Sequence, residues 1–157
     1  MRAHGYPELM PVIVVGADTR LGGAILDRLR SRQGEVRAFV SDPAVAERLR
    51  SDGGVKVALG DVSDGSHLGG AATGCFSAVL VTEAATDSRK RSFASKPDDV
   101  WTQWAGAVRD AEVSRVIWVG DIGPDVAGAE VAAVPTDDRS PTDIADEVAR
   151  LDEAAHI

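Results

Sequence analysis

The stretch of sequence that decides the fold is Val12-Ile13-Val14-Val15-Gly16-Ala17-Asp18-Thr19-Arg20-Leu21-Gly22-Gly23. A β-branched run ends at one glycine, and an amphipathic segment begins near a second. This pattern is typical of a buried strand, a tight turn and a helix. Phosphates bind at such turns because the unpaired N–H groups and the dipole of the helix point at them. We therefore predict a phosphate-binding turn, in which Gly16 permits the turn and Gly22 lets helix and strand pack closely.

The same strand–helix unit repeats along the rest of the chain. Strands are expected at 11–15, 36–40, 55–59, 78–81 and 116–119, with a further candidate at 130–134, and helices at 21–32, 41–49, 66–72, 98–112 and 141–154. In the first helix, Asp27, Arg28, Arg30 and Arg32 are expected to face outward. Strands that alternate with helices imply right-handed crossovers, so the predicted fold class is α/β, a three-layer doubly wound parallel sheet.

Composition narrows the functional classes. The chain has 157 residues, 44% of them hydrophobic and 27% charged, which fits one globular domain over 1–157. A net charge of −8 and a pI near 4.8 argue against nucleic acid or an anionic membrane as partner. The one cysteine, Cys75, excludes an internal disulfide and suits a reducing compartment, so we expect a cytoplasmic protein.

The turn Gly16-Ala17-Asp18-Thr19-Arg20-Leu21-Gly22 resembles the first turn, Gly-Ala-Thr-Gly-x-x-Gly, of the NmrA-like, atypical branch of the short-chain dehydrogenase/reductase superfamily. Further landmarks of that family recur in order at 36–43, Gly60-Asp61-Val62, 79–82, 113–123 and 142–148. The resemblance covers nearly the whole chain. It implies a Rossmann-like fold that binds NAD or NADP.

The resemblance also implies roles for individual residues. Gly16, Thr19, Arg20 and Gly22 would contact the phosphates, Asp61 the adenine, and Thr82 and Gly120 would form the floor under the nicotinamide. The full set of expected cofactor-binding residues is Gly16, Asp18, Thr19, Arg20, Leu21, Gly22, Ser41, Asp61, Val62, Thr82 and Gly120.

Three positions depart from the family pattern. Thr19 replaces the glycine that lets the backbone approach the pyrophosphate, so its side chain either crowds the phosphates or donates a hydrogen bond to them. Ser41 stands in place of the arginine that pairs with the 2′-phosphate of NADP in many relatives. Val40 stands where NAD-binding relatives carry an acid for the ribose hydroxyls. The preference between NAD and NADP therefore stays open.

The usual chemistry of the superfamily needs a tyrosine and a lysine four residues later. The one tyrosine, Tyr6, has no lysine near it, and all lysines lie upstream of the fifth strand. The connection from Gly123 to Thr142 is short, so most of the family's substrate-binding lobe is absent there. Hydride transfer driven by a tyrosine acid is therefore excluded, and no catalytic residue is assigned.

Several side chains allow two interpretations. Asp61 either contacts adenine or caps the following helix, and Glu83 and Asp121 are solvated loop acids or a pair that shares a proton. Cys75 is expected to be a buried structural thiol. The segment 84–96 is expected to be an exposed loop rather than a nucleic-acid patch. The histidines His4, His67 and His156 are scattered and are not expected to form a metal site. Trp101 and Trp104 are expected to pack in the core rather than to form a stacking platform.

Two functions are compatible with these observations. The first is an NAD(P)-binding protein that senses the cofactor or acts as a weak NAD(P)H-dependent reductase with a flavin or quinone acceptor. The second is a degenerate interaction module that works through a protein partner or as a homodimer. Binding of a dinucleotide distinguishes them.

Overall fold

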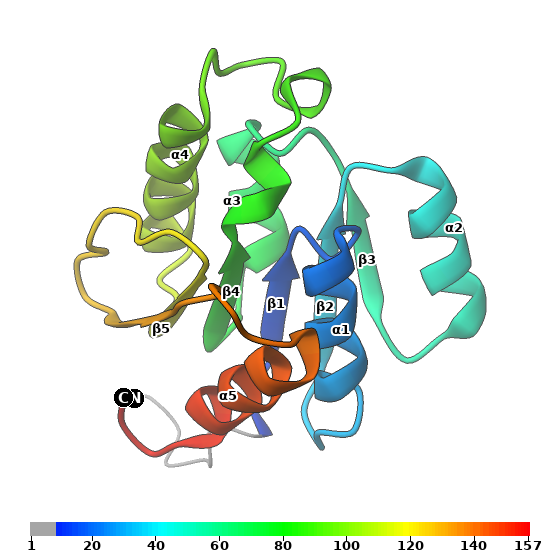
Figure 1. The fold of residues 1–157 in the computed structure, drawn as a ribbon, viewed down its shortest axis with the longest axis vertical. Helices are drawn as coiled ribbons and strands as arrows, with labels where there is room; N and C mark the ends of the chain where they lie inside the picture. Colours follow the sequence, from blue (N-terminus) through cyan, green and yellow to red (C-terminus); the bar gives the residue numbers. More distant parts are fainter. Residues whose placement is uncertain (1–8) are drawn as a thin grey trace.

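A computed structural model describes residues 9–157 and shows one six-stranded sheet (Figure 1). The strand order is β3-β2-β1-β4-β5-β6, and every neighbouring pair is parallel. The strands are β1 (Val12–Val15), β2 (Val36–Val40), β3 (Lys56–Leu59), β4 (Ser77–Val81), β5 (Arg115–Val119) and β6 (Glu130–Val134). The predicted doubly wound α/β fold is confirmed, and the candidate strand at 130–134 is the sixth strand.

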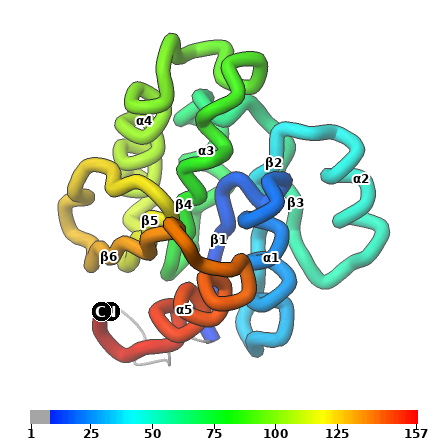
Figure 2. The backbone as a smooth tube through the Cα atoms, viewed as in Figure 1, coloured from blue at the N-terminus to red at the C-terminus, as the bar shows by residue number. Residues whose placement is uncertain are grey.

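Helices cover both faces of the sheet (Figures 1 and 2). One face is packed by α1 (Arg20–Leu29), α2 (Pro43–Asp52) and α5 (Pro141–Glu153), the other by α3 (Gly65–Ala72) and α4 (Pro97–Asp110). Side chains just before the helices accept hydrogen bonds from backbone N–H groups of the first turn: Thr19, Asp42, Asp64 and Ser140. These caps stabilise the helices at the carboxyl ends of the preceding strands.

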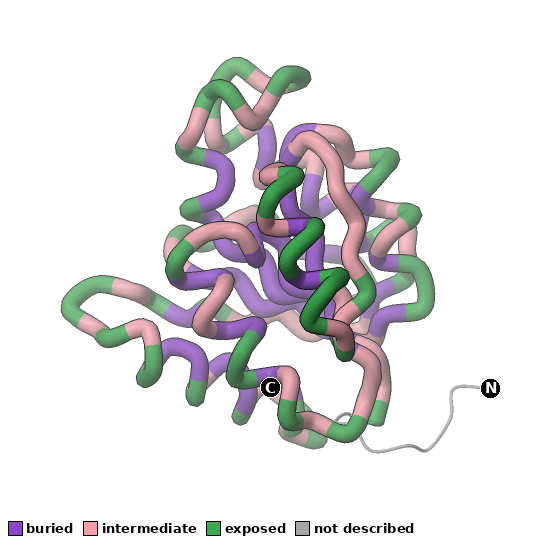
Figure 3. Tube along the Cα trace, turned by 90° about the vertical axis from the view of Figure 1, so that its right-hand side faces the viewer, coloured by how far each residue is buried: buried purple, intermediate pink, exposed green. Residues whose placement is uncertain are grey.

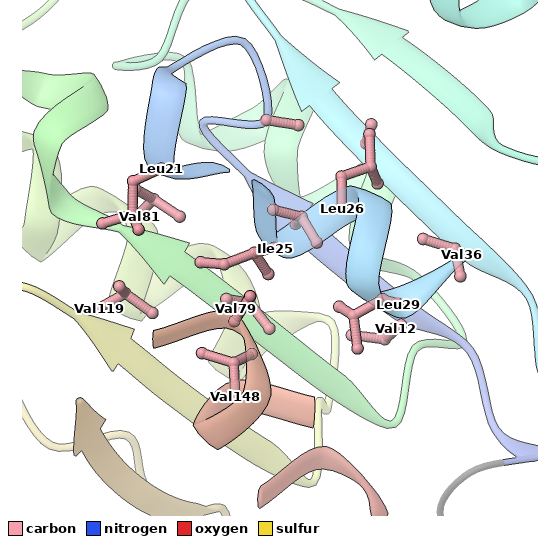
Figure 4. Packing of buried hydrophobic residues seen from close by; sticks show 14 of the residues in the cluster. Val12, Leu21, Ile25, Leu26, Leu29, Val36, Val79, Val81, Val119 and Val148 are labelled. Atoms are coloured by element: carbon pink, nitrogen blue, oxygen red, sulfur yellow. The ribbon is translucent and has the colours of Figure 1, made fainter. Parts of the chain in front are cut away.

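The strands are buried on both sides because helices lie above and below them. Figure 3 shows the buried strands enclosed by helices whose outer surfaces are exposed. In the close-up of one face, Ile25 of α1 and Val148 of α5 lie over Val79 of β4 (Figure 4). Small β-branched side chains fill this layer, as a core poor in aromatic residues requires.

The prediction that Arg32 faces outward is wrong. Its guanidinium lies 2.9 Å from Oδ2 of Asp152 on α5, and the two side chains are only 1% and 0% exposed. Arg28, one turn earlier, makes the outward pair that was expected, with Asp146 at 3.1 Å. The difference arises because α1 ends at Leu29, so Arg32 lies beyond the helix and no longer follows its outward side, and there it pairs with Asp152 of α5.

The segment 84–96 is not simply an exposed loop. It begins inside the 3₁₀ turn η2 (Thr82–Ala85) and contains a second one, η3 (Ser88–Lys90). Ala84 and Ala85 are buried in the core beside α4. Residues 86–96 then arch over the end of the molecule before α4 begins (Figure 2). Within residues 9–157, no helix is both long enough and apolar enough to cross a membrane.

Candidate functional site

The turn between β1 and α1 has the close geometry that its two glycines predict. Gly16 has φ +86°, in the left-handed region that favours glycine. A Cβ on Gly22 would lie 1.9 Å from the carbonyl oxygen of Gly16, so only glycine fits there. The turn sits between β1 and β4, where the strand order reverses, which is where ligands bind in open α/β sheets.

The side chain of Thr19 is folded into this turn. Its hydroxyl donates to the carbonyl of Gly16 at 2.8 Å and accepts from the N–H of Gly22 at 2.9 Å. Thr19 therefore caps α1, and its hydroxyl is already engaged. The N–H groups of Arg20 and Leu21 find no acceptor among residues 9–157, so they stay available for an anion at the start of α1.

Asp18 crosses from the same turn to the end of β2. Its Oδ2 accepts from the backbone N–H of Ser41 at 2.9 Å, the hydroxyl of Ser41 at 3.0 Å and the N–H of Asp42 at 3.1 Å. Lys90 lies above it, with Nζ 3.8 Å from Oδ2. Ser41 thus lies beside the turn, whereas Val40 points into the core and cannot serve a ribose.

Asp61 and Val62 follow β3 and hold the arching segment. Oδ2 of Asp61 accepts from the N–H of Ser92 at 2.8 Å, and the N–H of Val62 donates to the carbonyl of Lys90 at 3.1 Å. Partial burial raises the pKa of Asp61, but hydrogen bonds from Ser63 and Ser92 hold that pKa below its ordinary value. Of the two interpretations of Asp61, the one in which it caps the next helix is wrong, because Asp64 caps α3.

Thr82 and Gly120 meet at the ends of β4 and β5. The hydroxyl of Thr82 donates to the carbonyl of Val119 and accepts from the N–H of Asp121, both at 3.0 Å. Gly120 has φ +105°, and a Cβ there would lie 2.4 Å from the Thr82 hydroxyl. These residues border a cavity of about 280 Å³, lined by Leu21, Thr82, Glu83, Thr86, Val119, Gly120, Asp121, Pro135, Thr136 and Asp137.

Three exposed carboxylates line this cavity: Glu83, Asp121 and Asp137. The sequence interpretation placed the first two at neighbouring strand ends and missed the third. Asp137 was detectable in principle, because it follows β6, and the carboxyl ends of parallel strands meet at one edge of a sheet. The sequence indicates the strand at 130–134 only as a candidate, so Asp137 after it was not assigned to this edge of the sheet.

Cys75 and Trp104, which the sequence analysis also considered, lie in the core away from the cavity. Burial raises the pKa of the Cys75 thiol to about 11, as expected of a structural cysteine. The indole N–H of Trp104 donates to the carbonyl of Val62 at 2.7 Å inside the core. Among residues 9–157 no group of three or more His, Cys, Asp or Glu could hold a metal ion. His4 and Tyr6 lie outside the described residues.

Every residue predicted to bind the cofactor therefore lies along the carboxyl edge of the sheet, in or directly after a strand end or in the first turn of α1. They form three neighbouring parts. The first is the β1–α1 turn, the second the ends of β2 and β3, and the third the cavity beside β4, β5 and β6. The second part is covered by the chain's own segment 88–93.

Comparisons with known proteins agree with the fold. A family model described as NAD(P)H-binding matches residues 16–154. No curated protein matches the sequence. The fold is similar to a Rossmann-fold NAD(P)-binding family protein from Shigella flexneri, with a TM-score of 0.72 and 15% identity over 95% of this chain and 90% of that one.

Two reductases of Escherichia coli share the fold. One is ChuY, an anaerobillin reductase of strain O157:H7, with a TM-score of 0.68 and 16% identity over 93% of this chain and 92% of that one. The other is an NADPH-dependent quinone oxidoreductase complexed with NADPH, with a TM-score of 0.56 and 20% identity. In that pair 69% of this chain matches 36% of the oxidoreductase, so this chain spans about a third of its length.

Proposed function

Because this chain belongs to the NAD(P)H-binding family, we propose that it binds a dinucleotide across the carboxyl edge of its sheet, as a single domain of the NmrA-like type. One observation carries the proposal. The close Gly16–Gly22 turn opens a helix whose N–H groups at Arg20 and Leu21 are unpaired among residues 9–157, at the point where the strand order reverses.

The residues along the carboxyl edge of the sheet fit the pyrophosphate and nicotinamide parts of a dinucleotide. The N-terminus of α1 and the exposed guanidinium of Arg20 would hold the pyrophosphate, because both supply positive potential where the turn comes closest. Thr82 and Gly120 would form the floor under the nicotinamide beside the cavity, and the buried Thr82 hydroxyl, which bonds to Val119 and Asp121, would hold that floor in place.

The adenine end is different. The N–H of Val62 and the carboxylate of Asp61 already bond to Lys90 and Ser92. Contact of these two residues with adenine therefore requires that the segment 88–93 move aside. The expected role of Asp61 stays part of this proposal, with that condition attached.

The bound cofactor would supply a hydride. This chain offers no tyrosine–lysine pair for proton transfer, so a carbonyl acceptor that needs a protein acid is disfavoured. A flavin or quinone, which accepts hydride through positioning alone, fits better. The fold shared with an anaerobillin reductase and a quinone oxidoreductase supports this class, and the same binding would equally serve a sensor of cofactor level.

A second candidate is a degenerate interaction module acting through a protein partner or as a homodimer. The observation that favours it is the covered adenine end, together with two apolar side chains on the surface, Phe93 at 66% and Ile122 at 73% exposed. In this candidate the segment 88–93 never leaves Asp61 and Val62.

Calorimetric titration with NADH and with NADPH separates the two candidates. Saturable binding supports the cofactor site, and absence of binding up to about 1 mM favours the interaction module.

Arg20→Ala is expected to weaken dinucleotide binding about fivefold to tenfold, because an exposed phosphate contact contributes about 1 kcal/mol. Arg109→Ala, an exposed arginine at the far end of α4, is the matched control and should leave affinity unchanged. Equal affinities of both variants and the native protein would remove Arg20 from the site.

A further inference from the structure

We propose that Asp18 makes this site selective for NAD(H) against NADP(H), an inference that rests on the proposed function. The two cofactors differ only at the adenosine ribose, which carries a 2′-hydroxyl in NAD and a 2′-phosphate in NADP. In doubly wound folds that 2′ group meets the protein at the end of the second strand. Here Asp18 brings a carboxylate to that place from the β1–α1 turn.

The carboxylate of Asp18 already uses the donors that a 2′-phosphate would need. The N–H groups of Ser41 and Asp42 lie at the start of α2, a natural position for an anion. Both donate to Oδ2 of Asp18, and so does the Ser41 hydroxyl. The Asp18 side chain is only 2% exposed, so it is an integral part of this corner.

A 2′-phosphate would therefore meet a negative charge in place of free donors. Two like charges at close range repel, and the repulsion is strong where water is largely excluded. A 2′-hydroxyl has the opposite relation to the same group, because it can donate to a carboxylate. Oδ1 of Asp18 has no donor among residues 9–157, so it can accept such a bond.

One cation could reverse this preference. Lys90 lies 3.8 Å from Oδ2 of Asp18 and is 36% exposed, so its ammonium partly neutralises the carboxylate. If Lys90 instead turned toward a 2′-phosphate, NADPH would be the preferred cofactor. Lys90 belongs to the segment 88–93, and its carbonyl accepts from Val62. When adenine displaces that segment, Lys90 moves with it, and the Asp18 carboxylate loses the cation beside it.

The first test is the affinity of the native protein for NADH and NADPH, measured by calorimetry at one salt concentration. We expect NADH to bind at least about tenfold more tightly. The pair ADP-ribose and 2′-phospho-ADP-ribose, which lack the nicotinamide, should show the same ratio. Equal affinities or a preference for NADPH would overturn the inference and leave the proposed function standing. Failure of all four compounds to bind would overturn both.

The second test removes the charge. Asp18→Asn should reduce the NADH-to-NADPH ratio to within about threefold, because the amide can still accept from Ser41 without repelling a phosphate. Asp27→Asn changes the same charge on the exposed side of α1 and should keep the native ratio. A native ratio in a folded Asp18→Asn variant would show that Asp18 does not set selectivity. Lys90→Ala guards against a variant that fails to fold: it should preserve or raise the preference for NADH, and a lost preference would assign selectivity to Lys90.

Discussion

Replacing Gly22 with alanine is expected to destabilise the protein by about 3 kcal/mol, whereas the same change at the next residue, Gly23, should stabilise it. Both glycines lie in the first turns of α1. A Cβ on Gly22 would lie 1.9 Å from the Gly16 carbonyl oxygen and 2.9 Å from the Thr19 hydroxyl. A Cβ on Gly23 would meet nothing closer than the Ala17 carbonyl oxygen at 3.7 Å, an ordinary contact.

The magnitude follows from what must move. The Gly16 carbonyl accepts from the N–H of Thr19 at 3.1 Å and from its hydroxyl at 2.8 Å, so shifting it weakens two hydrogen bonds of about 1 kcal/mol each. Overpacking adds about 1–3 kcal/mol. The better helix propensity of alanine offsets about 1 kcal/mol at either position. Only this last contribution applies to Gly23→Ala, so the two variants should differ by about 4 kcal/mol.

Urea denaturation of the three proteins measures this difference directly. We expect similar m-values, a lower midpoint for Gly22→Ala and a slightly higher midpoint for Gly23→Ala. In thermal unfolding the lower stability of Gly22→Ala corresponds to about 10 °C. If Gly22→Ala were as stable as Gly23→Ala, the tight contact between α1 and the end of β1 would be refuted, and with it the geometry of the proposed phosphate turn.

Two further predictions concern buried groups. Asp152→Ala should lower the free energy of unfolding by about 3–5 kcal/mol, because it removes the carboxylate that pairs with the buried guanidinium of Arg32. Asp146→Ala, on the same helix, removes the exposed partner of Arg28 and should lower it by less than about 1 kcal/mol. Comparable losses of the two variants in urea denaturation would contradict the buried pair. Burial raises the pKa of the Cys75 thiol from 9.0 to about 11, so the stability linked to its neutral form is present below pH 9 and is lost as the pH rises toward 11. This contribution is at most about 3 kcal/mol, and the free energy of unfolding should therefore fall less steeply between pH 9 and 11 in Cys75→Ala than in the native protein; parallel curves would show that the thiol is not desolvated.

The local sequence pattern was enough to predict the helices and strands and the tight β1–α1 turn. The β-branched run at 12–15 predicts a strand buried on both faces, and Gly16 and Gly22 predict the turn and the close helix–strand contact that the structure contains. The alternation of strands and helices also predicts the parallel sheet, since right-handed crossovers leave few topologies. These features depend on residues near one another in the chain, and their periodicity is visible in the sequence.

Contacts between residues that are distant in sequence could not be predicted from local patterns. Asp18 bonds to Ser41, 23 residues away, and Arg32 pairs with Asp152 at a separation of 120. The segment 88–93 returns to cover Asp61, which no local signal indicates. A charged or polar residue near a turn looks the same in sequence whether it faces water, a ligand or another part of the chain.

The sequence by itself therefore determined the fold class, the position of the β1–α1 turn and the edge of the sheet where a ligand would lie. Only the tertiary structure decided which of the predicted site residues still have free hydrogen-bonding groups. The physical reason is that hydrophobic periodicity encodes which side of an element is buried, whereas the occupancy of a donor or carboxylate depends on which distant segment packs against it.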